Sequence, residues 1–402
     1  MAIDNKDKKV LNVPHMRFPE FTEEWNSKSL IDLANVIGGG TPDTTVKSYW
    51  DGEIQWFTPS EIGKSKYVDL SIRTITEEGL NNSSAKLLPS GTILLSTRAT
   101  IGECSLSLRK CATNQGFQSL VSKKCNTDFL YYLIQTKKKD LIRKSCGSTF
   151  LEISANEVRK IQVSVPTEVE QQRIAELLSL IDERIATQNK IIEDLKKLKS
   201  AISKYLFARK DLLETTICLS NIATLKNGYA FQSGKYNALG KWKILTITNV
   251  PGERYINDED CNCIINLPND IQDHQVLKEG DILISLTGNV GRVSLCKNGN
   301  YLLNQRVGLL QLAKNVNQEF LYQILSSQRF ENSMIACGQG AAQMNIGKGD
   351  VENYVLPYSS NGNNILWVAK ILHSYDECII NELRRLTLLT MQKQYLLTQM
   401  FI

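Results

Sequence analysis

The side chains that most often carry out chemistry are few in this 402-residue chain and stand apart from one another. Its histidines, His15, His274 and His373, have no Asp or Cys at the spacing of a metal site or a catalytic pair. Cys261 and Cys263 form a C-x-C without the second pair that a structural zinc site needs. These residues predict neither a metal site nor nucleophilic catalysis.

A weak nuclease-like pattern exists nearer the N-terminus. Asp43 and the stretch Glu53-Ile54-Gln55 loosely resemble the Asp and Glu-x-Lys arrangement of metal-dependent nucleases. Gln55 stands where the lysine would be, so chance accounts for the pattern better. The chain also lacks Asn-Pro-Pro-aromatic and Asp-Pro-Pro-Tyr methyltransferase motifs, a glycine fingerprint for S-adenosylmethionine and a Walker motif. We expect a non-catalytic chain whose activity depends on partner proteins.

The composition is that of a globular protein, with 42% hydrophobic and 22% charged residues, and the length suits two or three domains. No apolar run of about 18 residues occurs and the N-terminus is polar, so we expect neither a membrane span nor a secretory signal. The ten cysteines are scattered, which favours reduced thiols in a cytoplasm. The net charge is +5, and residues 1–165 carry 22 basic and 18 acidic side chains, which weakly favours a polyanionic partner there.

One stripe of side chains repeats every seven residues between Glu168 and Arg209, which is the spacing of a coiled-coil seam. The seam positions are Ile174, Leu178, Ile181, Ile185, Gln188, Ile192, Leu195, Lys199, Ile202 and Leu206. Pro166 and Thr167 fit the start of this helix, and its acidic first turns and basic last turns suit the helix dipole. A seam of roughly 50 Å needs a partner helix.

A matching stripe lies 194 residues further along the chain. Its positions are Val368, Leu372, Tyr375, Ile379, Glu382, Leu386, Leu389, Lys393, Leu396 and Met400. Parallel packing would set Lys199 beside Lys393, a like-charge layer. We therefore predict two antiparallel helices related by a pseudo-twofold axis, with Lys199 near Glu382 and Lys393 near Gln188.

The segment before the first long helix has the pattern of an α/β domain. Residues 30–37 are expected to form a short helix that ends at the glycine triplet 38–40. Residues 54–57 are expected to form a strand, with Trp56 and Phe57 in the core. Residues 127–144 are expected to form one helix.

The same order returns after the first long helix. Residues 88–98 match 277–287 at an offset of 189, and Asn114-Gln115 match Asn304-Gln305 at 190. The offset reaches only 194 at the long helices, so one unit of about 190 residues is written twice. Two similar domains held apart by a pair of long helices suit an extended ligand with twofold-like symmetry, and duplex DNA is the obvious one.

We therefore predict an α+β protein in which two α/β domains form an internal repeat and are separated by two long antiparallel coiled-coil helices. The expected segments are a first domain at 1–165, a long helix at 166–211, a second domain at 212–357 and a second long helix at 358–402.

Two phrases carry a family resemblance. One is Leu-Pro-Ser-Gly-Thr-Ile-Leu-Leu-Ser-Thr-Arg-Ala-Thr-Ile-Gly at 88–102 with Asn-Gln-Gly-Phe at 114–117; the other is Pro166, Glu-Gln-Gln-Arg-Ile-Ala at 170–175 and a long helix. Together they resemble the specificity (S) subunit of type I restriction-modification enzymes, over nearly the whole chain. The second copy departs at residues 361–367, which stand in place of the Glu-Gln-Gln-Arg stretch.

This resemblance implies that each globular domain is a target-recognition domain reading one half of a bipartite double-stranded DNA target, while the helix pair sets the unread spacer. Two methylation subunits would dock on the helices and bring S-adenosylmethionine for adenine N6 methylation. Restriction subunits would add cleavage and translocation that depend on ATP and Mg. No cofactor and no membrane contact are expected for this chain itself.

Base edges are read mainly by Arg, Asn, Gln, Ser and Thr, so we select such residues and nearby aromatics in the loops after strands. In the first domain the candidates are Thr41, Thr58, Ser60, Arg98, Thr100, Gln115, Ser148 and Thr149, with Lys137, Lys138 and Lys139 for phosphates. In the second they are Tyr229, Phe231, Gln232, Asn249, Thr287, Asn289, Arg306, Gln339, Gln343 and Asn345. Asn114 and Asn304 are predicted to form turns instead.

Three other functions would fit parts of the sequence. An orphan sequence-specific DNA binder would act without methylation subunits. A metal nuclease using Asp43 and Glu53 would cut DNA alone with magnesium. A coiled-coil adaptor would show no affinity for duplex DNA at low salt. Only a DNA-binding protein with two recognition domains accounts for repeated domains that are held apart by paired helices.

Overall fold

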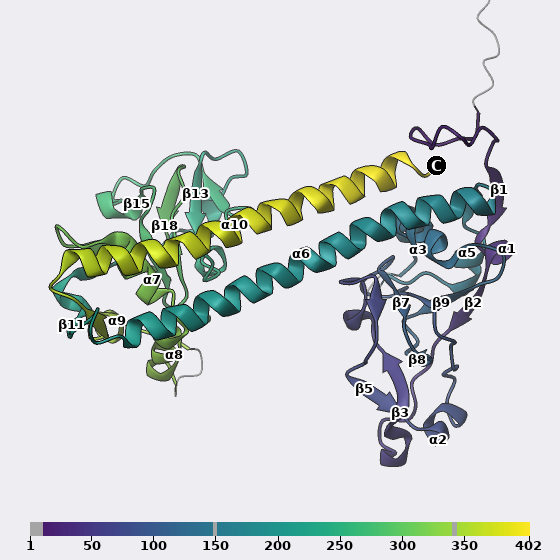
Figure 1. Cartoon of the computed structure of the whole chain (residues 1–402), viewed down its shortest axis with the longest axis horizontal. Helices are drawn as coiled ribbons and strands as arrows, with labels where there is room; N and C mark the ends of the chain where they lie inside the picture. Colours follow the sequence, from purple (N-terminus) through teal and green to yellow (C-terminus); the bar gives the residue numbers. More distant parts are fainter. Residues whose placement is uncertain (1–10, 148–150, 340–343) are drawn as a thin grey trace, which may run out of the picture. The chain divides into compact units, whose positions relative to one another are not determined.

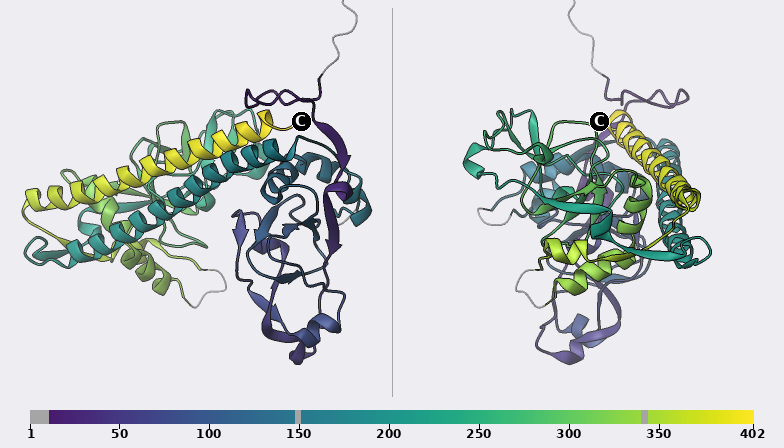
Figure 2. Two further views of the ribbon diagram at one scale, coloured as in Figure 1. Left: turned by 45° about the vertical axis from the view of Figure 1, so that its right-hand side comes forward. Right: turned by 90° about the vertical axis from the view of Figure 1, so that its left-hand side faces the viewer.

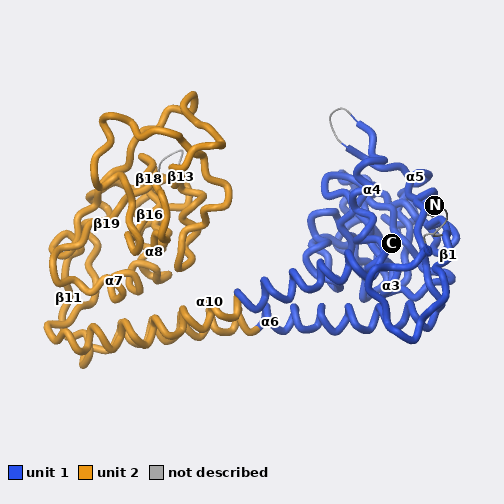
Figure 3. The backbone as a smooth tube through the Cα atoms, turned by 90° about the horizontal axis from the view of Figure 1, so that it is seen from above, with its two compact units in different colours: residues 1–190, 384–402 blue, residues 191–383 orange. Residues whose placement is uncertain are grey.

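The computed structural model describes residues 11–147, 151–339 and 344–402 and divides into two compact units, coloured separately in Figure 3. Unit 1 comprises residues 1–190 and 384–402, and unit 2 comprises residues 191–383. Each unit contains one α/β domain and part of both long helices, α6 (Glu168–Ala208) and α10 (Gly362–Gln399).

The α/β domain of unit 1 is built on three sheets. The largest has the strand order β2-β9-β6-β7-β4, a second has the order β5-β3-β8, and β1 pairs with β10. In chain order the elements are β1 (Asn26–Ser29), α1 (Leu30–Leu33), β2 (Ala34–Gly38), η1 (Lys47–Tyr49), β3 (Trp50–Phe57), η2 (Pro59–Glu61), β4 (Tyr67–Val68), β5 (Arg73–Ile75), α2 (Glu77–Asn81), β6 (Ile93–Leu95), β7 (Cys104–Ser107), β8 (Cys111–Thr113), β9 (Gln118–Ser122), α3 (Thr127–Thr136), α4 (Lys138–Arg143), α5 (Ala155–Arg159) and β10 (Gln162–Val165).

The domain of unit 2 also has three sheets, of orders β12-β19-β16-β17, β14-β13-β18-β15 and β11-β20. Its elements are β11 (Thr215–Cys218), η3 (Leu219–Asn221), β12 (Ala223–Asn227), η4 (Ser233–Lys235), β13 (Trp242–Leu245), η5 (Ile247–Asn249), β14 (Asn262–Ile264), η6 (Asp273–Gln275), β15 (Val276–Leu277), β16 (Ile282–Ser285), β17 (Val293–Leu295), β18 (Tyr301–Leu303), β19 (Val307–Leu312), α7 (Gln318–Leu325), α8 (Gln328–Cys337), α9 (Lys348–Glu352) and β20 (Val355–Tyr358).

The two domains repeat one topology, which confirms the predicted internal repeat. The order β2-β9-β6-β7 in unit 1 corresponds to β12-β19-β16-β17 in unit 2, with antiparallel pairing throughout. The parallel pair β3·β8 corresponds to the parallel pair β13·β18. The ribbons β1·β10 and β11·β20 also correspond, and each leads directly into a long helix.

Two sequence-based element assignments need correction. Residues 30–37 were expected to form one short helix, but the helix ends at Leu33 and residues 34–38 form strand β2, which pairs with β9. Residues 127–144 form two helices, because the chain leaves the helical path at Lys137. Trp56 and Phe57 are buried as predicted, at 4% and 1% exposure.

Helix α3 ties the domain of unit 1 to the helix pair. The Asn126 side chain caps its first turn by accepting from the Phe129 backbone N–H, which satisfies an otherwise free donor. Six consecutive residues from Phe129 are buried, so the helix is enclosed on several sides. The Phe129 ring stacks on Phe401 at 5.3 Å between centroids, and Trp25 packs against both rings edge-on. One apolar core therefore spans the sheet, α3 and both helices of unit 1.

In each unit α6 and α10 run side by side in opposite directions, as Figures 1 and 2 show. In unit 1 Ile174 near the start of α6 shares a core with Met400 beyond the end of α10. In unit 2 Leu206 near the end of α6 shares a core with Val368 near the start of α10. Every predicted seam side chain is buried or half-buried.

The partners predicted for the two seam lysines, Lys199 and Lys393, were wrong. Lys199 pairs with Asp376 at 2.6 Å, not with Glu382, and Lys393 pairs with Asp182 at 2.7 Å rather than lying opposite Gln188. Asp182 and Asp376 each follow a seam position by one residue, so they were left out of the stripe. A lysine side chain is long enough to reach diagonally past the seam to such a flanking carboxylate.

Within the described residues, no helix is both long enough and apolar enough to cross a membrane.

Candidate nucleic-acid interface

Four loops of unit 1 meet at one end of its sheets, and we call them loop cluster 1. They comprise residues 39–41, 58–60, 98–100 and 114–116, each beside the end of β2, β3, β6 or β9. The Thr41 hydroxyl donates to Gln115 Oε1 at 2.5 Å, and the Thr100 hydroxyl lies 3.5 Å from the Pro59 carbonyl oxygen. The fold thus gathers six first-domain candidates, Thr41, Thr58, Ser60, Arg98, Thr100 and Gln115, in one place.

Four corresponding loops in unit 2 form loop cluster 2, made of residues 228–230, 246–248, 287–289 and 304–306. The Leu286 N–H donates to the Arg306 carbonyl at 3.0 Å, just as the Thr97 N–H donates to the Gly116 carbonyl at 2.8 Å. Gly116 and Arg306 therefore occupy the same backbone position in the two clusters. Tyr229, Thr287, Asn289 and Arg306 are the second-domain candidates that this cluster contains.

A glycine in each cluster lets two loops approach closely. A Cβ added to Gly39 would lie 2.0 Å from the Asn114 carbonyl oxygen, and one added to Gly228 would lie 2.1 Å from the Asn304 carbonyl oxygen. No real Cβ tolerates such a distance, so only glycine allows this approach. Gly39, from the predicted glycine triplet, and Gly228 thus bring the loops of each cluster together.

The two asparagines form turns, as predicted. Asn114 Oδ1 accepts from the Gly116 N–H at 2.9 Å, and Asn304 Oδ1 accepts from the Arg306 N–H at 3.2 Å. Such short-range bonds hold the next residues in place at low cost. Gln115 and Gln305, which follow the asparagines, are both exposed.

The loop after the central parallel strand is held by a capping box in both units. In unit 1 the Thr58 N–H and hydroxyl donate to the Glu61 carboxylate at 2.7 and 2.6 Å. The Thr58 and Ser60 hydroxyl oxygens lie 3.1 Å apart. This arrangement orients a pair of hydroxyl groups beside the other loops of the cluster.

In unit 2 the Thr246 N–H and hydroxyl donate to Asn249 Oδ1 at 2.8 and 2.9 Å. The Asn249 amide donates to the Asn257 carbonyl, and the residue is 4% exposed. Asn249 was expected to contact bases; it is instead a buried cap with its amide used internally. Sequence analysis missed Thr246 and Thr248, whose hydroxyl oxygens lie 2.9 Å apart and match Thr58 and Ser60.

A cross-strand contact flanks each cluster and differs between the units. In unit 1 Arg98 bridges to Glu152, with Nη2 2.7 Å from Oε2. In unit 2 the bridge joins Thr287 to Asn345, and the Thr287 hydroxyl donates to Asn345 Oδ1 at 3.1 Å. Glu152 went unnoticed in the sequence because it stands 54 residues from Arg98.

The remaining second-domain candidates lie outside loop cluster 2 or at its edge. Phe231 lies at the edge of the cluster, and its ring centroid is 4.9 Å from that of Tyr229. The Tyr229 hydroxyl donates to Asp270 at 2.8 Å. Gln232 precedes η4, and Gln339 lies just after α8; both are exposed. Ser148, Thr149 and Gln343 lie outside the described residues.

Two of the three lysines expected to contact phosphates already have partners. Lys137 Nζ donates to the Ile402 carbonyl oxygen at 2.6 Å, and Lys138 Nζ lies 2.5 Å from Glu103 Oε1. Burial also lowers the pKa of the Lys137 ammonium. Lys139 is exposed.

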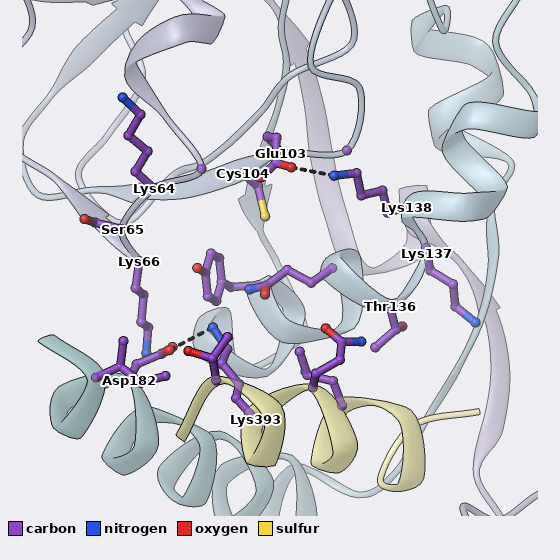
Figure 4. A pocket seen from close by; sticks show the side chains of 18 of the residues that line it. Lys64, Ser65, Lys66, Glu103, Cys104, Thr136, Lys137, Lys138, Asp182 and Lys393 are labelled. Atoms are coloured by element: carbon purple, nitrogen blue, oxygen red, sulfur yellow. Dashed lines mark hydrogen bonds and ion pairs between the residues drawn. The ribbon is translucent and has the colours of Figure 1, made fainter. Parts of the chain in front are cut away.

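These lysines line a cavity of about 1140 Å³ between the domain of unit 1 and its helix pair. Figure 4 shows the Lys138–Glu103 pair on the domain side of the cavity and the Lys393–Asp182 pair on the helix side. Lys64 also lines it, and the lining contains more lysines than acidic residues.

A buried polar network sets the domain of unit 1 on its helices. Lys66 Nζ lies 2.6 Å from Asp128 and donates to Ser179 on α6 at 2.7 Å. The Tyr132 hydroxyl donates to Asp182 at 2.7 Å, and Asp182 also forms an ion pair with Lys393. Because most of these groups are shielded from water, the network fixes one orientation of domain and helices.

Unit 2 repeats this network with different side chains. Arg254 takes the place of Lys66 and pairs with Glu319 at 2.6 Å and with Asp376 at 2.9 Å. Gln323 Nε2 donates to Asp376 at 2.6 Å, where unit 1 uses the Tyr132 hydroxyl. Lys199 completes the set on Asp376. Each domain is therefore positioned by one Asp on a long helix.

The outer faces of the helices carry exposed apolar side chains. In unit 1 Leu180, Leu388, Met391 and Tyr395 are 55–65% exposed. Leu180 and Leu388 line a groove of about 890 Å³ between α6 and α10. In unit 2 Leu198, Tyr205, Leu366 and Trp367 are also exposed. Leu180 and Leu388 share one groove, and exposed apolar groups gathered in this way are typical of protein-binding surfaces.

The nuclease-like residues do not form a metal site. Asp43 Oδ1 accepts from the Thr45 N–H and hydroxyl, and these bonds lower the pKa of Asp43. Gln55 Oε1 accepts from the Ser71 N–H at 2.7 Å. Among the residues described by the structure, no group of three or more His, Cys, Asp or Glu side chains could hold a metal ion.

Comparison with known proteins identifies one domain family in both halves of the chain. The model of the type I restriction modification DNA specificity domain matches residues 22–197 and 214–391. The MjaIX specificity subunit of Methanocaldococcus jannaschii is 36% identical over 46% of this chain and 44% of its own length. The EcoR124I/EcoR124II specificity subunit of Escherichia coli is 30% identical over 49% and 50%. These alignments span about half of each relative.

Solved structures resemble the chain over most of its length. The S subunit of a type I restriction-modification system from M. genitalium aligns with 97% of this chain and 99% of its own, with a TM-score of 0.56 and 17% identity. A chain from a study of complex assembly in the type I system aligns over 96% and 98%, with a TM-score of 0.56 and 15% identity. At these identities the likeness shows the shared fold.

Proposed function

Because the chain belongs to the family of type I restriction-modification DNA specificity subunits, whose domain it carries twice, we propose that each of its units reads one half of a bipartite target in duplex DNA. The observation that carries this proposal is the duplicated loop cluster. Both clusters use the same glycine approach, asparagine turn and threonine cap, yet they present different side chains for base contacts. A repeated backbone arrangement that presents different side chains suits the recognition of two different half-sites.

Base contacts in unit 1 are assigned to the exposed groups of loop cluster 1. Gln115 and Ser60 are exposed at its surface, and their amide and hydroxyl groups match base edges in the major groove. Lys64 and Lys139, which are exposed and line the neighbouring cavity, are assigned to DNA phosphates. Phosphate contacts would position the domain, and the loop cluster would supply the sequence preference.

The helix pair is proposed to set the unread spacer between the half-sites. Seam packing and the buried pairs on Asp182 and Asp376 hold each domain rigidly on the helices of its unit. A stiff ruler of this kind would favour one spacing, since half-sites must follow the helical phase of DNA.

The exposed apolar faces of α6 and α10 are proposed to dock two methylation subunits. The groove beside Leu180 and Leu388 offers apolar area that water would otherwise cover. In this assignment the methylation subunits hold S-adenosylmethionine and methylate adenine at N6. Restriction subunits join through the complex and use ATP and Mg, while this chain contributes recognition rather than catalysis.

Co-expression with the cognate methylation subunit, followed by single-molecule sequencing of host DNA for N6-methyladenine, tests this function. We expect a new bipartite motif with a fixed gap. A stable complex without methylation at any such motif would reject the proposal and favour an orphan DNA binder.

A further inference from the structure

Arg306 is the one arginine of loop cluster 2, and its surroundings differ from those of the arginine in loop cluster 1. Resting on the proposed function, we infer that Arg306 reads a guanine in the half-site of unit 2 and that the matching position of the other half-site lacks an equivalent free reader.

The first step of the argument is position. Arg306 and Gly116 occupy the same place, because both are held by the preceding asparagine and both accept a backbone bond from the neighbouring strand. A Cβ added to Gly116 would lie 3.6 Å from the Cβ of Arg98. Within each cluster, the loop position of Arg98 and the loop position of Arg306 are therefore neighbours. Unit 1 has its arginine at the first of these positions, and unit 2 has its arginine at the second.

The second step is charge. In unit 1 Glu152 faces Arg98 across the bridge and pairs with its guanidinium at 2.7 Å. In unit 2 the bridge partners are Thr287 and the neutral Asn345. Arg306 is exposed, and within the described part of the chain only its backbone, not its guanidinium, takes part in a hydrogen bond or ion pair. Arg306 therefore keeps the full donor capacity that Arg98 shares with Glu152.

The third step is geometry. A guanidinium offers two parallel N–H donors, which match the O6 and N7 acceptors of guanine in the major groove. Gln305, which precedes Arg306, and Asn289 on another loop of the cluster are both exposed and can contact neighbouring bases. An arginine already bound to a carboxylate must first give up that partner, so Arg98 would discriminate less strongly.

The test uses the full-length chain assembled with its methylation subunit, on duplexes that carry the motif defined by sequencing. Each guanine of the unit 2 half-site is replaced in turn, and equilibrium binding is measured at one salt concentration. For the wild type, we expect one replacement to weaken binding roughly tenfold to a hundredfold. For Arg306→Ala, the same replacement should change binding less than about threefold, while discrimination at other positions stays.

Arg329→Ala, an exposed arginine on α8 of the same unit, is the matched control and should keep the wild-type preference. Arg306→Lys should discriminate partially, because an ammonium group cannot donate in a fork. Retention of every guanine preference by Arg306→Ala would overturn the inference. Absence of any bipartite motif for the wild type would instead reject the proposed function.

Discussion

The ammonium group of Lys199 on α6 lies 2.6 Å from a carboxylate oxygen of Asp376 on α10. The equivalent pair in unit 1 is reversed in chain order, because there the lysine, Lys393, is on α10 and the acid, Asp182, is on α6. The offset of 194 that relates the helices converts one contact into the other. The same kind of Lys–Asp ion pair thus joins α6 to α10 in both halves of the duplicated sequence.

Asp376→Asn should destabilise unit 2 by about 3–5 kcal/mol, because Lys199 and Arg254 would both lose a buried anionic partner. Chemical denaturation of the purified chain measures the change. Lys197→Ala is the control: it removes the exposed pair with Glu193 and should cost about 0.5 kcal/mol or less. Equal effects of the two substitutions would argue against a buried structural pair.

Gly228→Ala should disturb loop cluster 2, because the new Cβ would collide with the Asn304 carbonyl oxygen. We expect a loss of about 1–3 kcal/mol in stability and weaker binding to the unit 2 half-site. Gly234→Ala places its Cβ in open space and should leave both unchanged. If Gly228→Ala binds the target as the wild type does, the close approach of the loops is not needed for reading.

Acid should remove a contribution of Asp258 to the stability of unit 2. Hydrogen bonds from Lys243, and then from Lys297 and Tyr301, hold the pKa of Asp258 well below its usual range, although partial burial opposes this shift. A lowered folded-state pKa stabilises the fold above the unfolded pKa of about 4, and this contribution is lost as the pH falls further.

At pH 7, Asp258→Asn should therefore be less stable than the wild type by about 1–2 kcal/mol. This difference should shrink steadily below about pH 4. Denaturant unfolding at several pH values measures it, with Asp260→Asn as the control for a nearby exposed acid. A difference that grows on acidification would contradict the assigned sign.

Lengthening both helices should lengthen the gap in the target. Duplicating residues 185–191 and 379–385 adds one heptad to each helix and preserves the seam. The added rise is about 10.5 Å, or about 3 base pairs of DNA. Methylation mapping should show unchanged half-sites and a gap longer by about that number. An unchanged gap would show that the helices do not act as the ruler.

The long helices were predictable because their signal is local and repeats every seven residues, so each of Ile174, Leu178 and Ile181 supports the others. The register was not predictable, because Asp182 and Asp376 look like ordinary surface acids until the partner helix is in place. Duplication carried similar information for the sheets, where matched phrases in both halves predicted one repeated topology.

The loop clusters were harder to predict because the same residue types cap turns and contact bases. Asn249 is a cap, whereas Thr246 and Thr248, which share no letter pattern with Thr58-Pro59-Ser60 beyond a leading threonine, form the matching loop. The neutralisation of Arg98 depends on Glu152, a partner distant in sequence. Such long-range pairings leave no trace in a single sequence.

The central claim is that each unit reads its own half-site, and matched substitutions in the two loop clusters test it most directly. One variant combines Ser60→Ala with Gln115→Ala, and the other combines Thr248→Ala with Gln305→Ala; all four side chains are exposed. Methylation mapping of each variant, co-expressed with the methylation subunit, should show relaxed sequence preference in one half-site only, a different half for each variant, with the gap unchanged. If both variants alter the same half-site, or neither alters the motif, the account of two independent readers is wrong.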